Sequence, residues 1–239
     1  MQCVILAGGM GTRIRHRSGD RPKALIPVRE KPFIFYQLAW LARQSVTRVV
    51  LSIGYQGRMI QSAVGDGSQF GLSVVYADEG NNLRGTGGAL RFIADLGLLD
   101  SGFFVLYGDS FLPIDLVPMW QSSRKGRDCT MAVLRNCGRW DKSNVIIKNG
   151  KIALYDKLAD NLRADDMEYI DYGISVLTRE VITHEIRAGE VADLAKLLNR
   201  LSVDGKLKCH EVFQRFYEIG SPQGLDDFEA YVRKDESTA

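Results

Sequence analysis

Apolar and polar positions in the first half of the chain follow two alternating patterns, one typical of buried strands and one typical of helices. Short, nearly continuous apolar runs predict strands at residues 2–7, 48–53, 72–77 and 103–107. Between them, large apolar residues at helical spacing predict a helix at residues 32–44. Residues 56–64 can form a short helix, and Thr86 can cap a helix that runs to about residue 96. Strands that alternate with helices are typical of a parallel sheet covered by helices on both faces.

Beyond residue 126 the pattern becomes richer in strands. The strand-like segments are 129–135, 144–148, 151–155, 169–177, 207–210 and 215–219. Asn149-Gly150 predicts a tight hairpin turn between two of them. Helical spacing returns at residues 179–185 and 191–201, and a last helix is expected from about Pro222, because proline suits a first helical turn. Residues 235–239 are expected to be disordered.

These elements predict an α/β fold with an open, mostly parallel Rossmann-like sheet, helices on both faces and a smaller β-rich insertion. The sequence has no internal repeat and no low-complexity linker. We therefore expect a single domain over residues 1–239, built from a first half at 1–126 and a second half at 127–239.

Charge and composition exclude several classes of protein. The net charge of +2 over 239 residues argues against a general nucleic-acid binder, although residues 12–31 carry seven basic side chains against two acids. No apolar run approaches the roughly 20 residues that cross a bilayer, and the first residues lack the charged segment of a signal peptide. The four cysteines show no metal-binding spacing and suit a reducing compartment. We expect a cytoplasmic protein that binds neither nucleic acid nor membrane.

A glycine-rich segment, Leu6-Ala7-Gly8-Gly9-Met10-Gly11-Thr12-Arg13, directly follows the first predicted strand. Glycines let backbone N–H groups approach a phosphate closely and form an anion nest. The segment matches neither the Walker A loop nor the GxGxxG fingerprint, which argues against a P-loop NTPase and a Rossmann dehydrogenase. Arg13 can bridge phosphate oxygens with its guanidinium fork, and Lys23, ten residues further on, supplies a mobile point charge.

The stretch LAGGMGTR…RPK resembles LAGGxGTRL…PK, the signature of the nucleoside-diphosphate-sugar pyrophosphorylases, which are sugar-1-phosphate nucleotidyltransferases with a GT-A-like fold. The resemblance implies that the loop wraps the nucleotide, that Arg13 holds the β- and γ-phosphates, and that Lys23 lies at the α-phosphate. By this resemblance the nucleotide-binding residues of the loop are Leu6, Ala7, Gly8, Gly9, Gly11, Thr12 and Arg13.

Two further segments resemble nucleotide-binding loops of the same family. Leu83-Arg84-Gly85-Thr86-Gly87-Gly88-Ala89 is similar to the family's LGTAGAL segment, which implies that Gly85 and Thr86 touch the base and ribose. Gly54-Tyr55 is similar to a loop that flanks the base, although a packing role for Tyr55 is an equal alternative.

Tyr107-Gly108-Asp109 ends the most apolar of the predicted strands. A carboxylate at the carboxyl end of a parallel strand faces the ligand crevice of an α/β sheet, and Mg²⁺ prefers one or two carboxylates plus phosphate oxygens and water. The family's GD motif implies that Gly108 contacts the nucleotide and that Asp109 is a ligand of Mg²⁺. The alternative is that Asp109 caps a helix.

The second metal ligand is expected near the C-terminus. Tyr217-Glu218-Ile219-Gly220-Ser221-Pro222 resembles the family's D-[IV]-G-T-P segment, whose acidic residue completes the metal site. Glu218 stands where aspartate is usual, and Ser221 where threonine is usual. Because glutamate is longer by one methylene, Glu218 is expected to hold Mg²⁺ either directly or through water.

The sugar-binding residues are expected in the second half. Tyr155-Asp156-Lys157 resembles the family's E-K pair, whose lysine contacts the phosphate of the sugar phosphate. Ile170-Asp171-Tyr172-Gly173-Ile174 resembles the segment that contacts sugar hydroxyls, which implies roles for Asp171 and Gly173. Asn144 is a further candidate for a hydroxyl contact. Alternatively, Asp171 caps a turn and Asn144 fixes the entry of the hairpin.

The resemblance implies an enzyme that transfers a nucleotidyl group from an NTP to a sugar 1-phosphate and releases pyrophosphate. Its catalytic residues would be Arg13, Lys23 and Lys157. In its loops and its length the chain resembles the short heptose- and mannose-1-phosphate guanylyltransferases. We therefore expect a guanine nucleotide as the NTP first and a uridine nucleotide second. A regulatory subunit that binds nucleotide sugars and a glycosyltransferase are the competing hypotheses. A homodimer is compatible with the sequence.

Overall fold

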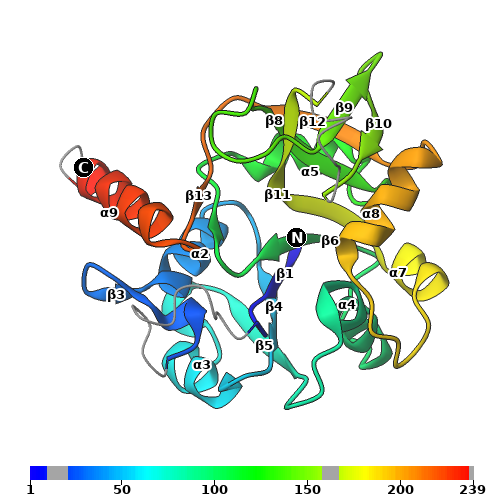
Figure 1. Cartoon of the computed structure of the whole chain (residues 1–239). Helices are drawn as coiled ribbons and strands as arrows, with labels where there is room; N and C mark the ends of the chain where they lie inside the picture. The colour runs from blue at the N-terminus through cyan, green and yellow to red at the C-terminus, as the bar shows by residue number, and fades with distance from the viewer. Residues whose placement is uncertain (10–20, 158–166, 237–239) are drawn as a thin grey trace.

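The computed structural model describes residues 1–9, 21–157 and 167–236. In this part of the chain, one sheet of nine strands carries the architecture, in the order β5-β4-β1-β6-β11-β8-β12-β10-β9. Helices cover both faces of the sheet (Figure 1). The structure is therefore a mixed α/β fold.

The first half of the chain forms a parallel block, as the alternating pattern predicts. Its strands are β5 (Ser73–Asp78), β4 (Arg48–Ile53), β1 (Gln2–Leu6) and β6 (Gly102–Tyr107). All neighbouring pairs among these four strands are parallel. The connecting helices are α2 (Phe33–Ala42), α3 (Gly57–Val64) and α4 (Gly85–Asp95). Each predicted strand and helix of this half is confirmed to within about two residues at either end.

The second half departs from the predicted open, mostly parallel sheet. Its strands are β8 (Thr130–Arg135), β9 (Val145–Lys148), β10 (Lys151–Tyr155), β11 (Tyr169–Thr178) and β12 (Lys208–Val212). Only β8 and β12 pair in parallel; β11 is antiparallel to both β6 and β8, and β10 is antiparallel to β9 and β12. Tyr169 also pairs with Val145, so this end of the sheet curls back on itself. The sequence predicted strands here without their direction, and the mostly parallel order of the first half does not extend to them.

Smaller elements complete the fold, and several were not predicted. Two short ladders pair β2 (Pro27–Val28) with β3 (Lys31–Pro32), and β7 (Ser110–Phe111) with β13 (Tyr217–Glu218). The remaining helices are η2 (Lys23–Leu25), η3 (Ser68–Phe70), α5 (Leu116–Ser122), α7 (Arg179–Glu185), α8 (Leu194–Val203) and α9 (Pro222–Glu236). Helix α9 begins at Pro222 as predicted, but it continues to Glu236, so residues 235 and 236 are helical rather than disordered.

Two apolar cores lie on opposite faces of the sheet because strand side chains alternate in direction. Cys3 and Ile5 of β1 pack with α2, α3 and α9, whereas Val4 packs with α4, α7 and α8. Cys3 and Cys129 are buried free thiols.

The predicted hairpin turn joins β9 to β10, with φ of 52° at Asn149 and 72° at Gly150, as expected for the favoured two-residue turn. Among the described residues, no helix is long and apolar enough to cross a membrane.

Candidate active site

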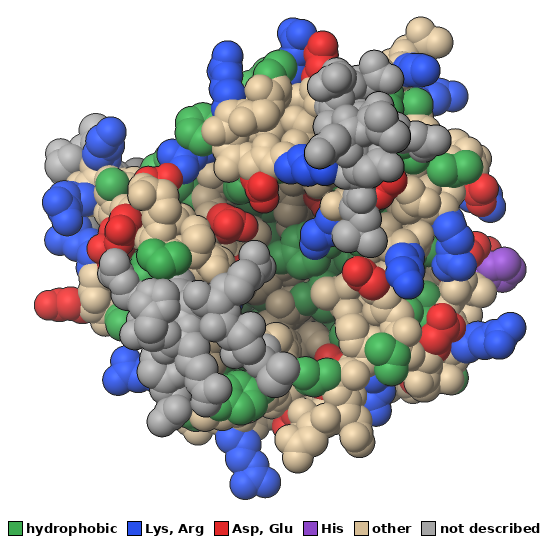
Figure 2. All heavy atoms as spheres, in the orientation of Figure 1, with side chains coloured by type: hydrophobic (Ala, Val, Ile, Leu, Met, Phe, Trp, Pro, Cys, Tyr) green, Lys and Arg blue, Asp and Glu red, His purple; other side chains and the backbone are tan. Residues whose placement is uncertain are grey.

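A cavity of about 360 Å³ opens where the parallel strands β1 and β6 end. Its wall includes Leu6, Ala7, Gly8 and Gly9, which follow β1, and Tyr107, Gly108 and Asp109, which follow β6. Figure 2 shows this face of the molecule hollowed near its centre, with apolar side chains in the depth. The cavity lies at the carboxyl edge of the parallel block, where ligands bind in α/β sheets.

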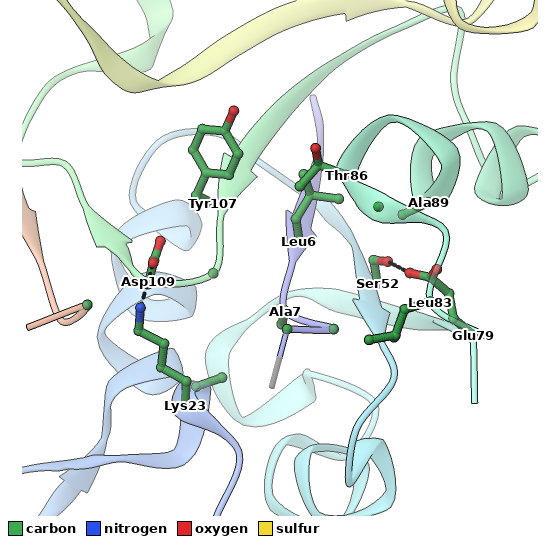
Figure 3. A pocket seen from close by; sticks show the side chains of 16 residues that line it. Leu6, Ala7, Lys23, Ser52, Glu79, Leu83, Thr86, Ala89, Tyr107 and Asp109 are labelled. Atoms are coloured by element: carbon green, nitrogen blue, oxygen red, sulfur yellow. Dashed lines mark hydrogen bonds and ion pairs between the residues drawn. The ribbon is translucent and has the colours of Figure 1, made fainter. Parts of the chain in front are cut away.

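At one end of the cavity, Lys23 and Asp109 form an ion pair. Lys23 Nζ lies 2.6 Å from Asp109 Oδ2, and the side chains are 15% and 30% exposed (Figure 3). Lys23 begins η2, while Asp109 lies in the turn between β6 and β7. Because β7 rather than a helix follows Asp109, the helix-capping alternative is wrong.

The β13–β7 ladder brings Glu218 to the same end of the cavity. Glu218 pairs with Ser110, and the Ile219 N–H donates to the Asp109 carbonyl oxygen at 2.9 Å. A Cβ placed on Gly220 would lie 3.1 Å from Lys23 Nζ and 3.5 Å from Glu218 Oε1. Lys23 and Glu218, which lie almost 200 residues apart in sequence, therefore flank one glycine, and Lys23 also contacts Asp109.

The opposite end of the cavity carries a buried carboxylate that the sequence analysis missed. Glu79 is 7% exposed; Ser52 Oγ donates to its Oε1 at 3.2 Å, and the Arg84 N–H donates to its Oε2 at 2.8 Å. Figure 3 shows Ser52 and Glu79 on the side of the cavity away from Lys23 and Asp109. The available signal was its position one residue after β5, at the carboxyl end of a parallel strand.

The start of α4 joins the first half of the chain to the second. Gly85 and Thr86 both line the cavity, and Thr86 Oγ1 donates to Asp193 Oδ1 at 3.0 Å. Gly85 has a φ of +70°, and a Cβ there would lie 2.6 Å from the Ala192 carbonyl oxygen. The glycine thus allows close packing against the 189–193 segment, in addition to the ligand approach that the sequence suggests.

The predicted sugar-binding residues form a second group beside Tyr107. The Asp171 N–H donates to Asn144 Oδ1 at 2.9 Å, and the Gly173 N–H donates to Asp171 Oδ1 at 2.9 Å. Lys157 Nζ lies 5.8 Å from the ring centroid of Tyr107. Lys157 also lines a separate cavity of about 590 Å³ in the second half of the chain.

Burial governs the ionisation of this second group. It raises the pKa of the Asp171 carboxyl above its ordinary value, and the hydrogen bond from Gly173 and the charge on Lys157 oppose the shift only in part. Burial also raises the pKa of the Tyr107 hydroxyl, and the nearby carboxylates of Asp171 and Asp193 raise it further. Tyr107, which lines the first cavity, therefore stays a neutral phenol.

Not every predicted residue reaches the cavity. Gly11, Thr12 and Arg13 lie outside the described residues. Tyr55 is half-buried in the turn between β4 and α3 and is not among the side chains that line the cavity. Asn144 accepts a hydrogen bond from the Asp171 backbone, which agrees with the alternative that Asn144 fixes the entry of the hairpin. A contact between Asn144 and a sugar hydroxyl stays a prediction.

Fold and site together define an α/β protein with a charged cavity at the carboxyl edge of its parallel strands. The chain belongs to the nucleotidyl transferase family, whose model matches residues 2–139.

Two curated relatives illustrate the match. The chain is 27% identical to a mannose-1-phosphate guanylyltransferase of Mycobacterium tuberculosis, over 93% of this chain and 62% of the relative. It is 35% identical to the D-glycero-α-D-manno-heptose 1-phosphate guanylyltransferase of Campylobacter jejuni, over 48% of this chain and 51% of the relative. The chain therefore spans between about half and three fifths of these relatives' length.

The fold also matches solved structures over nearly its whole length. HddC from Yersinia pseudotuberculosis superposes with a TM-score of 0.75 at 25% identity, covering 97% of this chain and 99% of HddC. A second structure of HddC contains GMP-PN.

Proposed function

We propose that this protein is an enzyme that transfers a nucleotidyl group from an NTP to a sugar 1-phosphate, giving an NDP-sugar and pyrophosphate. The observation that carries the proposal is the position of Lys23 at one end of the cavity, where it contacts Asp109 and lies beside Gly220 together with Glu218. Lys23 suits the charged phosphates of an NTP, the two carboxylates suit a cation that accompanies those phosphates, and the more apolar remainder of the cavity suits a nucleoside. Family membership supports the same reaction class.

In this reaction a phosphate oxygen of the sugar 1-phosphate attacks the α-phosphorus of the NTP in line. The bond from the α-phosphorus to the bridging oxygen breaks, and pyrophosphate leaves with that electron pair. No covalent bond to the protein is needed, so the protein contributes positioning and charge stabilisation. We assign Lys23 to the α-phosphate, Arg13 to the leaving pyrophosphate and Lys157 to the attacking phosphate.

The donor set at this end of the cavity fits Mg²⁺. Asp109, directly before β7, and Glu218, on the adjoining strand β13, offer hard carboxylate oxygens, and Lys23 places a positive charge against Asp109. Among residues 1–9, 21–157 and 167–236, no cluster of three or more His, Cys, Asp or Glu side chains could hold a metal. Two carboxylates suffice for Mg²⁺ when phosphate oxygens and water supply the remaining ligands. When bound, the ion would neutralise phosphate charge.

The two halves of the chain would divide the substrates in a GT-A-like arrangement. Residues 1–126 would bind the nucleotide through the loop after β1, with Gly8, Gly9, Gly108 and Thr86 at the cavity wall. Residues 127–239 would bind the sugar phosphate through Lys157, Asp171, Gly173 and Asn144. A homodimer and a cytoplasmic location stay predictions.

Within this reaction, we propose guanine as the base and a mannose- or heptose-type 1-phosphate as the acceptor. The carboxylate of Glu79 supports guanine, because its two oxygens keep accepting capacity beyond the bonds from Ser52 and Arg84. The Watson–Crick edge of guanine presents two adjacent donors, N1–H and the N2 amino group. Uracil and thymine present one donor between two carbonyl oxygens, which a carboxylate would repel.

Replacing Glu79 by glutamine is expected to lower the preference for GTP over UTP, measured as the ratio of kcat/KM values, by roughly 10-fold or more. A good bidentate pair between a side chain and a base discriminates by about 1–3 kcal/mol. Asp78→Asn is the matched control, because it removes an exposed carboxylate one residue away whose Oδ1 accepts from the Gly80 N–H. An unchanged ratio of kcat/KM values in Glu79→Gln would refute the proposal that the Glu79 carboxylate binds the guanine base.

The test of the overall proposal is pyrophosphate release by the purified protein with Mg²⁺. ATP, GTP, CTP, UTP and dTTP are each paired with a panel of mannose-, heptose-, glucose- and amino-sugar 1-phosphates. Release with GTP and a mannose- or heptose-type acceptor supports the full proposal. Release with UTP and a hexose or amino-sugar phosphate would identify the uridylyltransferase alternative. If no combination releases pyrophosphate but an NDP-sugar still raises the Tm of the protein, the protein is instead a regulatory subunit that binds nucleotide sugars.

A further inference from the structure

Gln37 lies in the middle of α2, fully buried, and its side chain reaches the turn that carries Asp109. Its amide Nε2 donates to the Tyr107 carbonyl oxygen at 3.0 Å and to the Ser110 carbonyl oxygen at 2.7 Å. These two carbonyls stand on either side of Gly108-Asp109. One side-chain amide therefore holds both ends of the turn.

The other backbone hydrogen bonds of this turn come from two further parts of the fold. The Gly108 N–H donates to the Leu6 carbonyl oxygen at 3.0 Å, and the Asp109 carbonyl oxygen accepts from the Ile219 N–H. Gln37 of α2, Leu6 at the end of β1 and Ile219 directly after β13 therefore all hold residues 107–110. These bonds fix the backbone from which the Asp109 side chain projects, and Lys23 contacts the carboxylate itself.

The side-chain oxygen of Gln37 shows that stability alone does not account for this residue. Gln37 Oε1 is buried and has no hydrogen-bond partner in the part of the chain that the structure describes. A buried acceptor without a donor is destabilising, and an apolar side chain of the same length would avoid that cost. The contribution of Gln37 therefore lies at its two donor bonds, beside Asp109.

Anchoring of α2 to the sheet does not require Gln37. Trp40 Nε1 donates to the Ile114 carbonyl oxygen at 3.2 Å, and the Tyr36 hydroxyl donates to the Val28 carbonyl oxygen at 3.0 Å. Ile34, Leu38 and Leu41 of the same helix are fully buried in the apolar core. Loss of Gln37 would leave the helix in place while releasing the turn.

We infer that Gln37 is a positioning residue that holds the Asp109 carboxylate in the orientation that binds a divalent cation. The inference rests on the proposed function, because it takes Asp109 as a metal ligand. Outer hydrogen-bond partners that orient a metal-binding group typically contribute 10- to 100-fold to affinity or activity. Gln37 differs from such partners in acting on the backbone at both sides of the ligand.

The test measures the dissociation constant of Mn²⁺ for the protein without nucleotide, from free Mn²⁺ by electron paramagnetic resonance, together with the Tm. Gln37→Met keeps the length and helix preference of the side chain but removes both donors and the unpartnered acceptor. We expect the dissociation constant to rise roughly 10-fold or more while the Tm stays near that of the wild type. If Gln37→Met fails to fold, Gln37→Leu serves in its place.

Gln2→Met is the matched control at the other end of β1. Gln2 is also buried, but its Nε2 donates to the Leu98 carbonyl oxygen and its Oε1 accepts from the Asp100 N–H, so both groups are satisfied. This variant should lower the Tm and leave Mn²⁺ affinity unchanged.

Asp109→Asn, run in parallel, separates the two hypotheses. If Asp109→Asn loses Mn²⁺ binding and Gln37→Met keeps wild-type affinity, the inference about Gln37 is wrong and the proposed metal site stands. If Asp109→Asn itself binds Mn²⁺ like the wild type, the proposed metal site is wrong, and the role of Gln37 is refuted with it.

Discussion

Lys23→Ala is expected to lower kcat for pyrophosphate release by roughly 30- to 1,000-fold. Lys23 is a charged donor 2.6 Å from the Asp109 carboxylate, and loss of one preorganised electrostatic donor typically removes about 2–4 kcal/mol of transition-state stabilisation. The measurement is kcat at saturating NTP and sugar phosphate. Because the Lys23 side chain is only 15% exposed, its ammonium acts in a partly desolvated site where a charge is worth more than in water.

Lys31→Ala is the control for this prediction. Lys31 is exposed in the short β2–β3 ladder, eight residues from Lys23 in the same basic segment. The Lys31→Ala variant should keep the kcat of the wild type if the loss in Lys23→Ala comes from the position of Lys23 in the cavity rather than from the change in net charge. A kcat of Lys23→Ala close to that of the wild type would show that the α-phosphate assignment is wrong.

The sequence predicted where some of the candidate residues lie, because their place depends on local order along the chain. Asp109 was expected at a ligand crevice because it follows an apolar strand, and the carboxyl ends of parallel strands face such a crevice. Lys23 was singled out through the resemblance to a family signature, and both residues line the cavity, while their roles stay predictions. Their 2.6 Å contact then follows from the fold, since η2 and the end of β6 meet at the same edge of the sheet.

The sequence could not reveal residues whose role depends on distant partners. Gln37 contacts carbonyl oxygens of residues 70 and 73 positions away, and a buried glutamine in a helix has no local signature of such a bond. In the sequence, Glu79 is simply a polar residue that follows a strand. Its site is defined only in the folded chain, where Ser52 and the Arg84 N–H donate to its carboxylate. In both cases the tertiary fold, not the local pattern, gives the side chain its neighbours.

Strand direction was the main error at the level of the fold. Hydrophobic runs predict where strands lie but not which way they run, because burial on both faces looks the same in either direction. The hairpin at Asn149-Gly150 correctly predicts one antiparallel pair. The antiparallel insertion of β11 between β6 and β8 has no comparable signal, since its partners lie more than 30 residues away.

Asp109→Asn is expected to reduce pyrophosphate release about 100-fold or more at a fixed Mg²⁺ concentration. The substitution keeps the shape of the side chain and an oxygen that can accept from Lys23, but it removes the negative charge that a hard cation prefers. Asp115→Asn is the matched control, because Asp115 caps α5 through the Val117 N–H and asparagine caps a helix equally well. It should retain wild-type activity.

The Mg²⁺ dependence of Asp109→Asn decides what the carboxylate does. If Asp109 is a metal ligand, the Mg²⁺ concentration for half-maximal rate should rise, and excess Mg²⁺ should restore part of the activity. If Asp109 acts mainly by orienting Lys23, that concentration should stay unchanged, and adding Lys23→Ala to Asp109→Asn should cost nothing further. Residues that act as a unit give such non-additive losses, so the double variant separates the two roles where either single variant cannot.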